Sequence, residues 1–256
     1  MAGVDRVEAL TGLRLQPWED SMPLTGDPER LQARVERDGF LYLRRVIPQE
    51  RIAALRALVL DHAGKVAWLD PSAPVEAAHG WPGKRIGDYE KEDWLALQSL
   101  VQLSPELWDV GDSLLEVLRN AFGRPSFLFL GLNTCRVVSP HPEMTTRPHQ
   151  DAHYVGPPDM FVTAWVPLGD CPIELGPVVA LAGSHRRGLL HHHGVGIIDG
   201  GVDVEEDAVW HSGGARAGDA LILTPLTIHR ALPNLTGTRL RLSVDLRYGF
   251  HGSDGR

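Results

Sequence analysis

Residues 239–248 read RLRLSVDLRY, a stretch in which apolar and polar side chains alternate. Alternate side chains of a strand point to opposite faces. The aliphatic residues at 240, 242, 244 and 246 would therefore face one way, and Arg239, Arg241 and Ser243 the other. Two arginines and a serine inside a β-core are costly unless an anion meets them. Because guanidinium pairs bidentately with carboxylate, the stretch predicts a dicarboxylate site or, alternatively, an edge strand with its polar face in water.

Similar short apolar runs fill the chain from about residue 126 onward, separated by Gly, Pro, Asn and Asp. They are FLFLGL (127–132), TCRVV (134–138), FVTAWVPL (161–168), VVALAG (178–183) and ALILTPL (220–226). Many short strands between turn residues predict a mainly β sandwich or barrel. We therefore expect a single domain over 1–256, with a helix-rich part about 1–125 and a β-core about 126–250.

The N-terminal half shows helical periodicity instead. Leu31 and Val35 lie on one face of a helix predicted over 28–37, a strand is expected at 40–43, and Pro48 would open a second helix. A third helix is predicted over 105–122. The polar segment 68–94 carries three tryptophans and predicts either a lid or binding loop, or a plain surface excursion.

Composition narrows the class of protein. The chain has 256 residues, is 43% hydrophobic and carries a net charge of −8, which fits a globular fold and argues against a nucleic-acid partner. Its apolar runs are too short to span a membrane, and it starts without the pattern of a signal peptide. Two cysteines, Cys135 and Cys171, are too few for a disulfide framework, so we expect a cytoplasmic protein.

The densest set of metal-ligand types lies in RPHQDAHY (147–154). In an extended chain His149 and Asp151 point to the same side, because they are two residues apart. His229, after the run ALILTPLTI, is the best third ligand. Two histidines and a carboxylate with open positions are typical of non-haem Fe(II) oxygenases. A bare His-x-Asp also occurs by chance, and His149 then has only a structural role.

Four stretches in the expected order resemble the phytanoyl-CoA dioxygenase-like family of Fe(II)/2-oxoglutarate oxygenases. They are DGFLYLRRVIPQERIAALR, RPHQDAHY, TAWVPLGDCPIELGPVVALAGSH and HRALPNLTGTRLRLSVDLRY. The resemblance implies a double-stranded β-helix, a jelly-roll or cupin-like fold with flanking helices. It also implies that His149, Asp151 and His229 hold iron.

The family's arginine for the far carboxylate of 2-oxoglutarate falls at Leu240 here. Counting forward from His229 favours Arg239, whereas counting back from the end of the strand favours Arg241. We prefer Arg241, because Ser243 then lies on the same face. The resemblance also suggests Gln150 and Asn133 as contacts to the cosubstrate.

Three further residues are candidates for the substrate pocket. His153 continues the spacing of residues 149 and 151, Trp165 follows the His-x-Asp segment, and Trp81 lies in the 68–94 loop. Each has a plainer interpretation: a hydrogen-bonded histidine, a core aromatic and a surface residue. His185 in the Gly-Ser-His turn is expected to be structural, and His191-His192-His193 to form a solvated run.

The resemblance implies a hydroxylase that consumes dioxygen and 2-oxoglutarate and releases succinate and CO2. Because related halogenases lack the carboxylate, Asp151 favours oxygenation over halogenation. We expect a small metabolite or natural-product intermediate as substrate. The alternatives are a cupin-like metalloenzyme that does not use 2-oxoglutarate and a non-catalytic binding protein on the same fold. The sequence does not define the oligomeric state.

Overall fold

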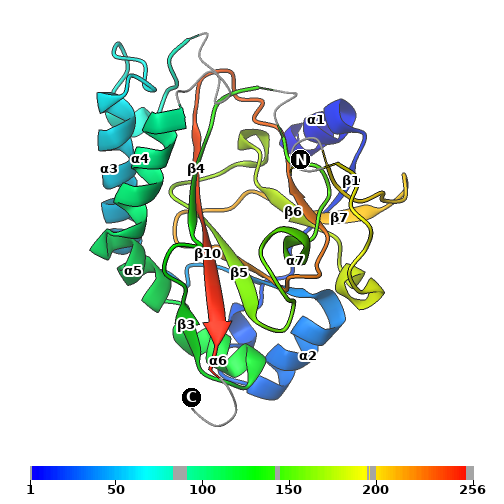
Figure 1. Cartoon of the computed structure of the whole chain (residues 1–256). Coiled ribbons are helices and arrows are strands. Elements are labelled where there is room, and N and C mark those ends of the chain that lie inside the picture. The colour runs from blue at the N-terminus through cyan, green and yellow to red at the C-terminus, as the bar shows by residue number, and fades with distance from the viewer. Residues whose placement is uncertain (1, 83–90, 142–144, 195, 197–199, 252–256) are drawn as a thin grey trace.

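Two β-sheets form the centre of the protein, and the computed structural model describes every residue except 1, 83–90, 142–144, 195, 197–199 and 252–256 (Figure 1). The major sheet has the order β2-β8-β5-β10-β3, and β4 also pairs with β10. Its strands are β2 (Phe40–Leu43), β3 (Ser126–Leu128), β4 (Thr134–Val138), β5 (Phe161–Pro167), β8 (Ala220–Leu223) and β10 (Arg241–Phe250). The minor sheet, of order β1-β7-β6-β9, contains β1 (Arg14–Pro17), β6 (Val178–Ala180), β7 (Val209–Ser212) and β9 (His229–Ala231).

All but one of the described α-helices lie before residue 123, as the sequence predicts. Figure 1 shows α3, α4 and α5 side by side along one flank of the major sheet. The α-helices are α1 (Ala2–Thr11), α2 (Pro28–Asp38), α3 (Gln49–Lys65), α4 (Lys91–Gln102), α5 (Pro105–Asp112), α6 (Leu115–Phe122) and α7 (Asp151–Tyr154). Short 3-10 turns are η1 (Met22–Leu24), η2 (Val75–Ala77), η4 (Ile173–Leu175) and η5 (Ser184–Arg187). The N-terminal part also supplies β1 and β2, one strand to each sheet.

The prediction of one helix over 105–122 is wrong, because the chain forms α5 and α6 instead. Ser104 caps the start of α5 by accepting a hydrogen bond from the backbone N–H of Leu107. Near its end, the carbonyl of Asp109 accepts hydrogen bonds from the Ser113 hydroxyl and the Arg51 guanidinium. These side chains compete with the helical N–H of the next turn, so the helix stops there.

Strand β10 divides the interior into an apolar side and a polar side. Leu242, Val244, Leu246 and Tyr248 belong to the largest hydrophobic cluster, which also contains the buried faces of α2 to α6. The alternate residues Arg241, Asp245 and Arg247 line a cavity on the other side. The alternation predicted from the sequence is therefore confirmed, and every residue from 241 to 249 is buried. Burial on both faces excludes the edge-strand interpretation.

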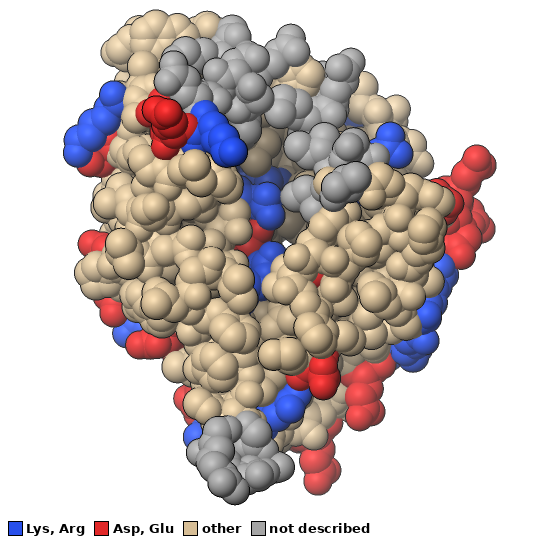
Figure 2. All heavy atoms as spheres, in the orientation of Figure 1, with Lys and Arg blue, Asp and Glu red and all other residues tan. Residues whose placement is uncertain are grey.

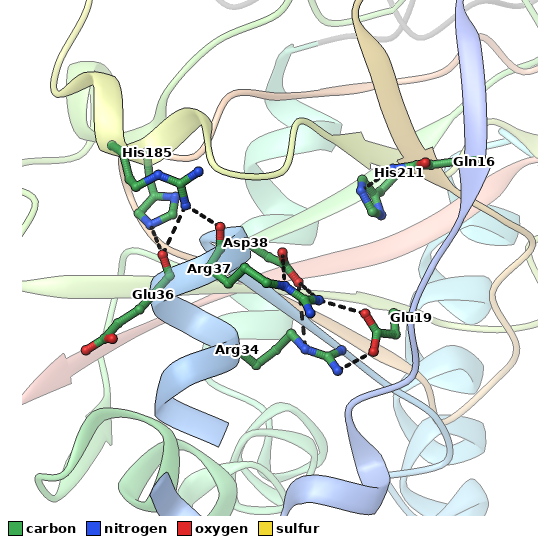
Figure 3. A network of polar contacts seen from close by, with 9 residues as sticks. Gln16, Glu19, Arg34, Glu36, Arg37, Asp38, His185 and His211 are labelled. Carbon is green, nitrogen blue, oxygen red and sulfur yellow. Dashed lines mark hydrogen bonds and ion pairs between the residues drawn. The ribbon is translucent and has the colours of Figure 1, made fainter. Parts of the chain in front are cut away.

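A polar network fixes α2 to the turn η5 (Figure 3). His185 and Arg186 both reach the carbonyl of Glu36, at 3.2 and 3.3 Å, at the C-terminus of α2. The cation of Arg186 is favourable at that end of a helix dipole. Gly39 follows with φ of +81°, and a Cβ there would come within 2.5 Å of the Thr227 hydroxyl, so the tight junction requires glycine. The expectation that His185 is structural agrees with these contacts.

The segment 68–94 is not one uniform loop. Trp68 is 1% exposed and packs in the main core, whereas Trp81 and Trp94 are 40% and 37% exposed. Residues 83–90 lie outside the described part of the chain, and α4 begins at Lys91. The interpretation of 68–94 as a binding loop therefore stays a prediction. Within the described residues, no helix combines the length and apolarity that a membrane crossing requires.

Candidate metal centre

Backbone pairing brings the three predicted ligands together. His149 and His229 form an antiparallel bridge, in which each N–H donates to the other's carbonyl at 3.0 Å. Asp151, two residues after His149, is the first residue of the single-turn helix α7. Its Oδ1 lies 3.8 Å from His149 Nε2 and 3.6 Å from His229 Nε2. One ligand atom from each residue lies within 4.8 Å of the others, and all three residues are buried. This spacing suits a single metal ion.

The other ring nitrogen of each histidine is held by the backbone. His149 Nδ1 lies 2.8 Å from the carbonyl of Arg147, and His229 Nδ1 lies 3.0 Å from that of Thr227. A carbonyl only accepts, so Nδ1 carries the proton and the Nε2 lone pair is free to bind a metal. The local chain geometry thus selects the ligand tautomer.

The second oxygen of Asp151 is also held in place. Thr163 on β5 donates its hydroxyl to Asp151 Oδ2 at 2.5 Å, and Arg247 Nη2 lies 3.5 Å from the same oxygen. Oδ1 is thereby left to face the two histidines. Burial alone would raise the pKa of Asp151, but Arg247, the two histidines and Thr163 together hold that pKa below its usual range. The carboxylate is therefore ionised, as a ligand must be.

We expect the metal-free protein to lose stability as the pH falls from 7 to 5. Burial lowers the pKa of His149 from 6.5 to about 3, and burial also lowers the pKa values of His185, His192 and His211. Below pH 6.5 these histidines bind protons in the unfolded chain but resist protonation in the native state, and this difference favours unfolding. Urea midpoints at pH 7, 6 and 5 test this effect, and a midpoint that stays constant or rises would contradict it.

The variant Thr163→Val should weaken Fe(II) binding while the fold is retained. Valine has nearly the shape of threonine but lacks the hydroxyl that orients Asp151. Loss of such an outer hydrogen bond typically costs roughly 10- to 100-fold in metal affinity. Anaerobic calorimetry with Fe(II) measures the change, and Thr11→Val in α1, remote from the ligands, is the control. Equal affinities in the two variants would refute the role of Thr163.

Arg241 is the better placed of the two candidate arginines. It lines the cavity and is 3% exposed, and its Nη1 donates to the carbonyl of Gly176. Its Nε and the hydroxyl of Ser243 are buried and have no hydrogen-bond partner among the residues that the structure describes. Arg239 instead precedes β10 and points its Nη2 at the carbonyl of Asp170, 3.2 Å away. Buried unpaired donors are costly, so Arg241 and Ser243 fit an anionic ligand.

Two predicted cosubstrate contacts have other partners. Gln150 donates its amide to the carbonyls of Gly188 and Leu226 and accepts from the N–H of Leu190. Asn133 donates to the carbonyl of Phe129 and accepts from the N–H of Arg247. Both side chains therefore connect backbone segments around the centre. Their contact with 2-oxoglutarate stays a prediction.

The three predicted substrate residues differ in whether they line the cavity. His153 does not continue the face of residues 149 and 151, because the chain turns into α7 at Asp151; it stacks on His192 at 4.1 Å between ring centroids. Trp165 lines the cavity, and its buried Nε1 has no partner. Trp81 is absent from the described cavity lining, so its contact with substrate stays a prediction.

Sequence reasoning missed five polar residues that line the same cavity, one of them Thr146. Thr163 and Arg247 hold Asp151, whereas Arg136 on β4 pairs with Asp245 on β10. The alternation that places Arg241 and Ser243 on the inner face of RLRLSVDLRY continues through residues 245 and 247. It would therefore have placed Asp245 and Arg247 on the same face. Within TCRVV, Arg136 likewise alternates with the buried residues Cys135 and Val137.

Comparisons with known proteins agree with this geometry. A protein named 1-deoxypentalenic acid 11-beta-hydroxylase from Streptomyces exfoliatus is 28% identical over 249 residues, covering 91% of this chain and 85% of its own. The same-named protein of Streptomyces arenae is 28% identical over 248 residues, with 90% and 84% covered.

Solved structures share the fold. EvdO2 from Micromonospora carbonacea var. aurantiaca, complexed with 2-oxoglutarate, has a TM-score of 0.61 at 20% identity, over 89% of this chain and 94% of that one. The epimerase SnoN, in complex with Fe3+, alpha ketoglutarate and nogalamycin RO, has a TM-score of 0.53 at 22% identity, over 88% and 84%. These likenesses confirm the predicted double-stranded β-helix.

The family model described as phytanoyl-CoA dioxygenase (PhyH) matches residues 35–242, which is most of the chain. The matched range contains the two histidines, Asp151 and Arg241. This chain belongs to the phytanoyl-CoA dioxygenase family.

Proposed function

We propose that this protein, by its family an Fe(II)- and 2-oxoglutarate-dependent oxygenase, hydroxylates an unactivated carbon of a small natural-product intermediate. One observation carries the proposal. Three buried ligand atoms within 4.8 Å of one another share a cavity with the buried arginine Arg241. In the described part of the chain, the Nε of Arg241 and the hydroxyl of Ser243 lack partners. A two-histidine, one-carboxylate set leaves coordination positions open for other ligands.

The residues present fit both groups. His149, Asp151 and His229 would hold the iron through Nε2, Oδ1 and Nε2, the atoms that the backbone, Thr163 and Arg247 leave free. Arg241 and Ser243 would bind the far carboxylate of 2-oxoglutarate through donors that lack partners. The carbonyl of Gly176 orients Arg241 by accepting a hydrogen bond from its Nη1. A Cβ at Gly176 would come within 2.4 Å of the carbonyl oxygen of Leu232, so only glycine fits there.

In the reaction, the residues of the chain would bind and orient the iron, 2-oxoglutarate and the substrate, and they would exclude water. When bound, iron and 2-oxoglutarate supply the oxidising power, so that dioxygen, 2-oxoglutarate and a substrate C–H bond yield succinate, CO2 and an alcohol. The protein holds Asp151 ionised and His149 neutral before any ligand arrives. Apolar side chains beside the ligands, those of Trp165, Val178, Leu223 and Ala231, keep the cavity wall dry.

The choice of substrate class rests on the relatives and on the cavity. Two curated relatives are named as hydroxylases of 1-deoxypentalenic acid. The structurally similar protein SnoN is an epimerase from nogalamycin biosynthesis. Trp165, Val178, Leu223 and Ala231 give the otherwise polar cavity an apolar part, and apolar contacts beside converging polar groups are typical of a small-molecule site. Both observations support a small, largely apolar metabolite.

The test is an anaerobic absorbance titration of metal-free protein, first with Fe(II) and then with 2-oxoglutarate. A visible charge-transfer band that requires both additions is the expected result. The variant His229→Ala should not give the band, because it lacks one of the three ligands. Succinate release on admission of air, with a panel of terpenoid and polyketide intermediates, then identifies the substrate.

The control variant is His191→Ala/His193→Ala. The expectation of a solvated histidine run is wrong for His192, which is buried. His191 and His193 are exposed, and His193 contacts Asp203 at 3.0 Å, so these two residues could bind iron adventitiously. This variant should keep the band. Iron binding without any band, or substrate turnover that persists without 2-oxoglutarate, would overturn the proposal in favour of a metalloenzyme that does not use this cosubstrate.

A further inference from the structure

The cavity contains more charged residues than the metal and 2-oxoglutarate require. Arg136, Arg241 and Arg247 line it together with Asp151 and Asp245. Figure 2 shows cationic and anionic side chains inside a hollow on this face, between walls of uncharged residues. Charges removed from water are costly unless they are paired, so each of these groups needs a counterpart.

The ion pairs within the cavity leave the arginines in different states. Arg136 Nε donates to Asp245 Oδ2 at 2.5 Å, and Arg247 Nη2 lies 3.5 Å from Asp151 Oδ2. Arg241 has only the carbonyl of Gly176 among the described residues. Arg241 is thus the cation available to 2-oxoglutarate, and the other two already face carboxylates.

The charge balance of the loaded site, which rests on the proposed function, is not closed. Among the cavity-lining residues that the structure describes, three arginines against two aspartates leave one positive charge. A divalent iron and the dianion 2-oxoglutarate cancel each other, so the surplus persists. The two ligand histidines do not reduce it, because a metal-bound imidazole is neutral. A third ligand that carries one negative charge would neutralise the cavity.

Arg136 is the cation that such a ligand can reach. It lines the cavity and its side chain is 31% exposed, whereas the side chain of Arg247 is 6% exposed and Arg241 is 3% exposed. Asp245 engages only Nε, and the terminal nitrogens of Arg136 have no hydrogen-bond partner among the described residues. The ion pair therefore fixes the guanidinium while its outer edge remains available. That edge can bind both oxygens of a carboxylate.

We propose that Arg136 binds a carboxylate of the substrate, so that the enzyme acts on a monoanionic acid with an apolar body. Asp245 is the positioning residue that aims Arg136. The apolar cavity residues Trp165, Val178, Leu223 and Ala231 would contact the body of the acid. Asp245 also raises the pKa of Arg136, which keeps the guanidinium charged.

The test uses matched probes on protein loaded anaerobically with Fe(II) and 2-oxoglutarate. The probes are cyclopentane-, cyclohexane- and adamantane-carboxylate, each with its primary amide. Calorimetry gives the dissociation constants, and the shift of the charge-transfer band reports binding beside the iron. We expect a carboxylate to bind roughly 10- to 100-fold more tightly than its amide, the usual range for a charge-assisted hydrogen bond.

The decisive variant is Arg136→Gln/Asp245→Asn, which removes the ion pair without changing the net charge of the cavity. The preference for the carboxylate should fall to near parity, while the affinity for 2-oxoglutarate stays within about twofold of wild type. Arg136→Lys, which leaves Asp245 paired, should give an intermediate preference because an ammonium lacks the bidentate fork.

Three results would overturn the proposal. The preference could survive in the double variant, the double variant could weaken 2-oxoglutarate binding as much as Arg241→Ala does, or no carboxylate in the series could bind to wild-type protein. Failure of the proposed function itself is recognised earlier, because wild-type protein would then give no charge-transfer band before any probe is added.

Discussion

Replacing Asp151 by alanine is expected to abolish coupled turnover and most Fe(II) binding. The variant loses the one anionic metal ligand, so its affinity should fall by more than the roughly 10- to 100-fold that an outer hydrogen bond costs. It also leaves the guanidinium of Arg247 without the carboxylate at 3.5 Å. Leaving one partner of a buried pair alone costs about 3 kcal/mol or more, so the free energy of unfolding should drop as well.

A second substitution separates these two effects. Asp151→Ala/Arg247→Met removes both charges, and we expect it to recover much of the lost stability in urea denaturation without recovering Fe(II) binding. Iron binding is measured by anaerobic calorimetry, and turnover by succinate release. If Asp151→Ala keeps normal Fe(II) affinity, the assignment of the metal ligands is wrong.

The substitution Arg241→Ala should chiefly raise the concentration of 2-oxoglutarate that the enzyme requires. A buried, charge-assisted pair that loses one partner costs about 2–5 kcal/mol, which corresponds to roughly 30- to 5000-fold in the dissociation constant. Iron binding should change little, because no ligand atom is lost. The measurement is the 2-oxoglutarate dependence of the charge-transfer band under anaerobic conditions.

Arg239→Ala is the matched control for that experiment. It removes the same side chain two residues earlier, from a position that contacts the carbonyl of Asp170 and lies outside the cavity. We expect wild-type affinity for 2-oxoglutarate. A strong effect of Arg239→Ala with none from Arg241→Ala would show that the register of β10 has been misassigned.

Local periodicity was sufficient to predict the β-core and the facing of β10. In a strand with two buried faces, the alternation of polar and apolar residues determines which face each side chain occupies. The inward position of Arg241 and Ser243 could therefore be predicted from the sequence. The break between α5 and α6 could not, because it depends on Arg51, which lies 58 residues away in the chain and reaches the carbonyl of Asp109.

The candidate site was predictable only in part, for a similar reason. Residue types and spacing indicated His149, Asp151 and His229, and the family resemblance supported them. The roles of Gln150 and His153 depended on where the chain bends. The bend at Asp151 turns His153 onto His192 and sends the Gln150 amide into the loop at Gly188 and Leu190. Such tertiary contacts leave no pattern in neighbouring residues.

The pairing of β2 with β8 constrains the order in which the protein can assemble. Residues 40–43 find their partners at 220–223, and β3 finds its partner at 248–250. During synthesis, the apolar residues of β2 stay unpaired until residues 220–223 have emerged. Such distant pairings slow folding and prolong exposure of aggregation-prone segments. Substitutions in β8 should therefore reduce the yield of folded protein more strongly than equally buried substitutions within α3, whose packing partners η2, α4 and α5 lie nearer in the chain.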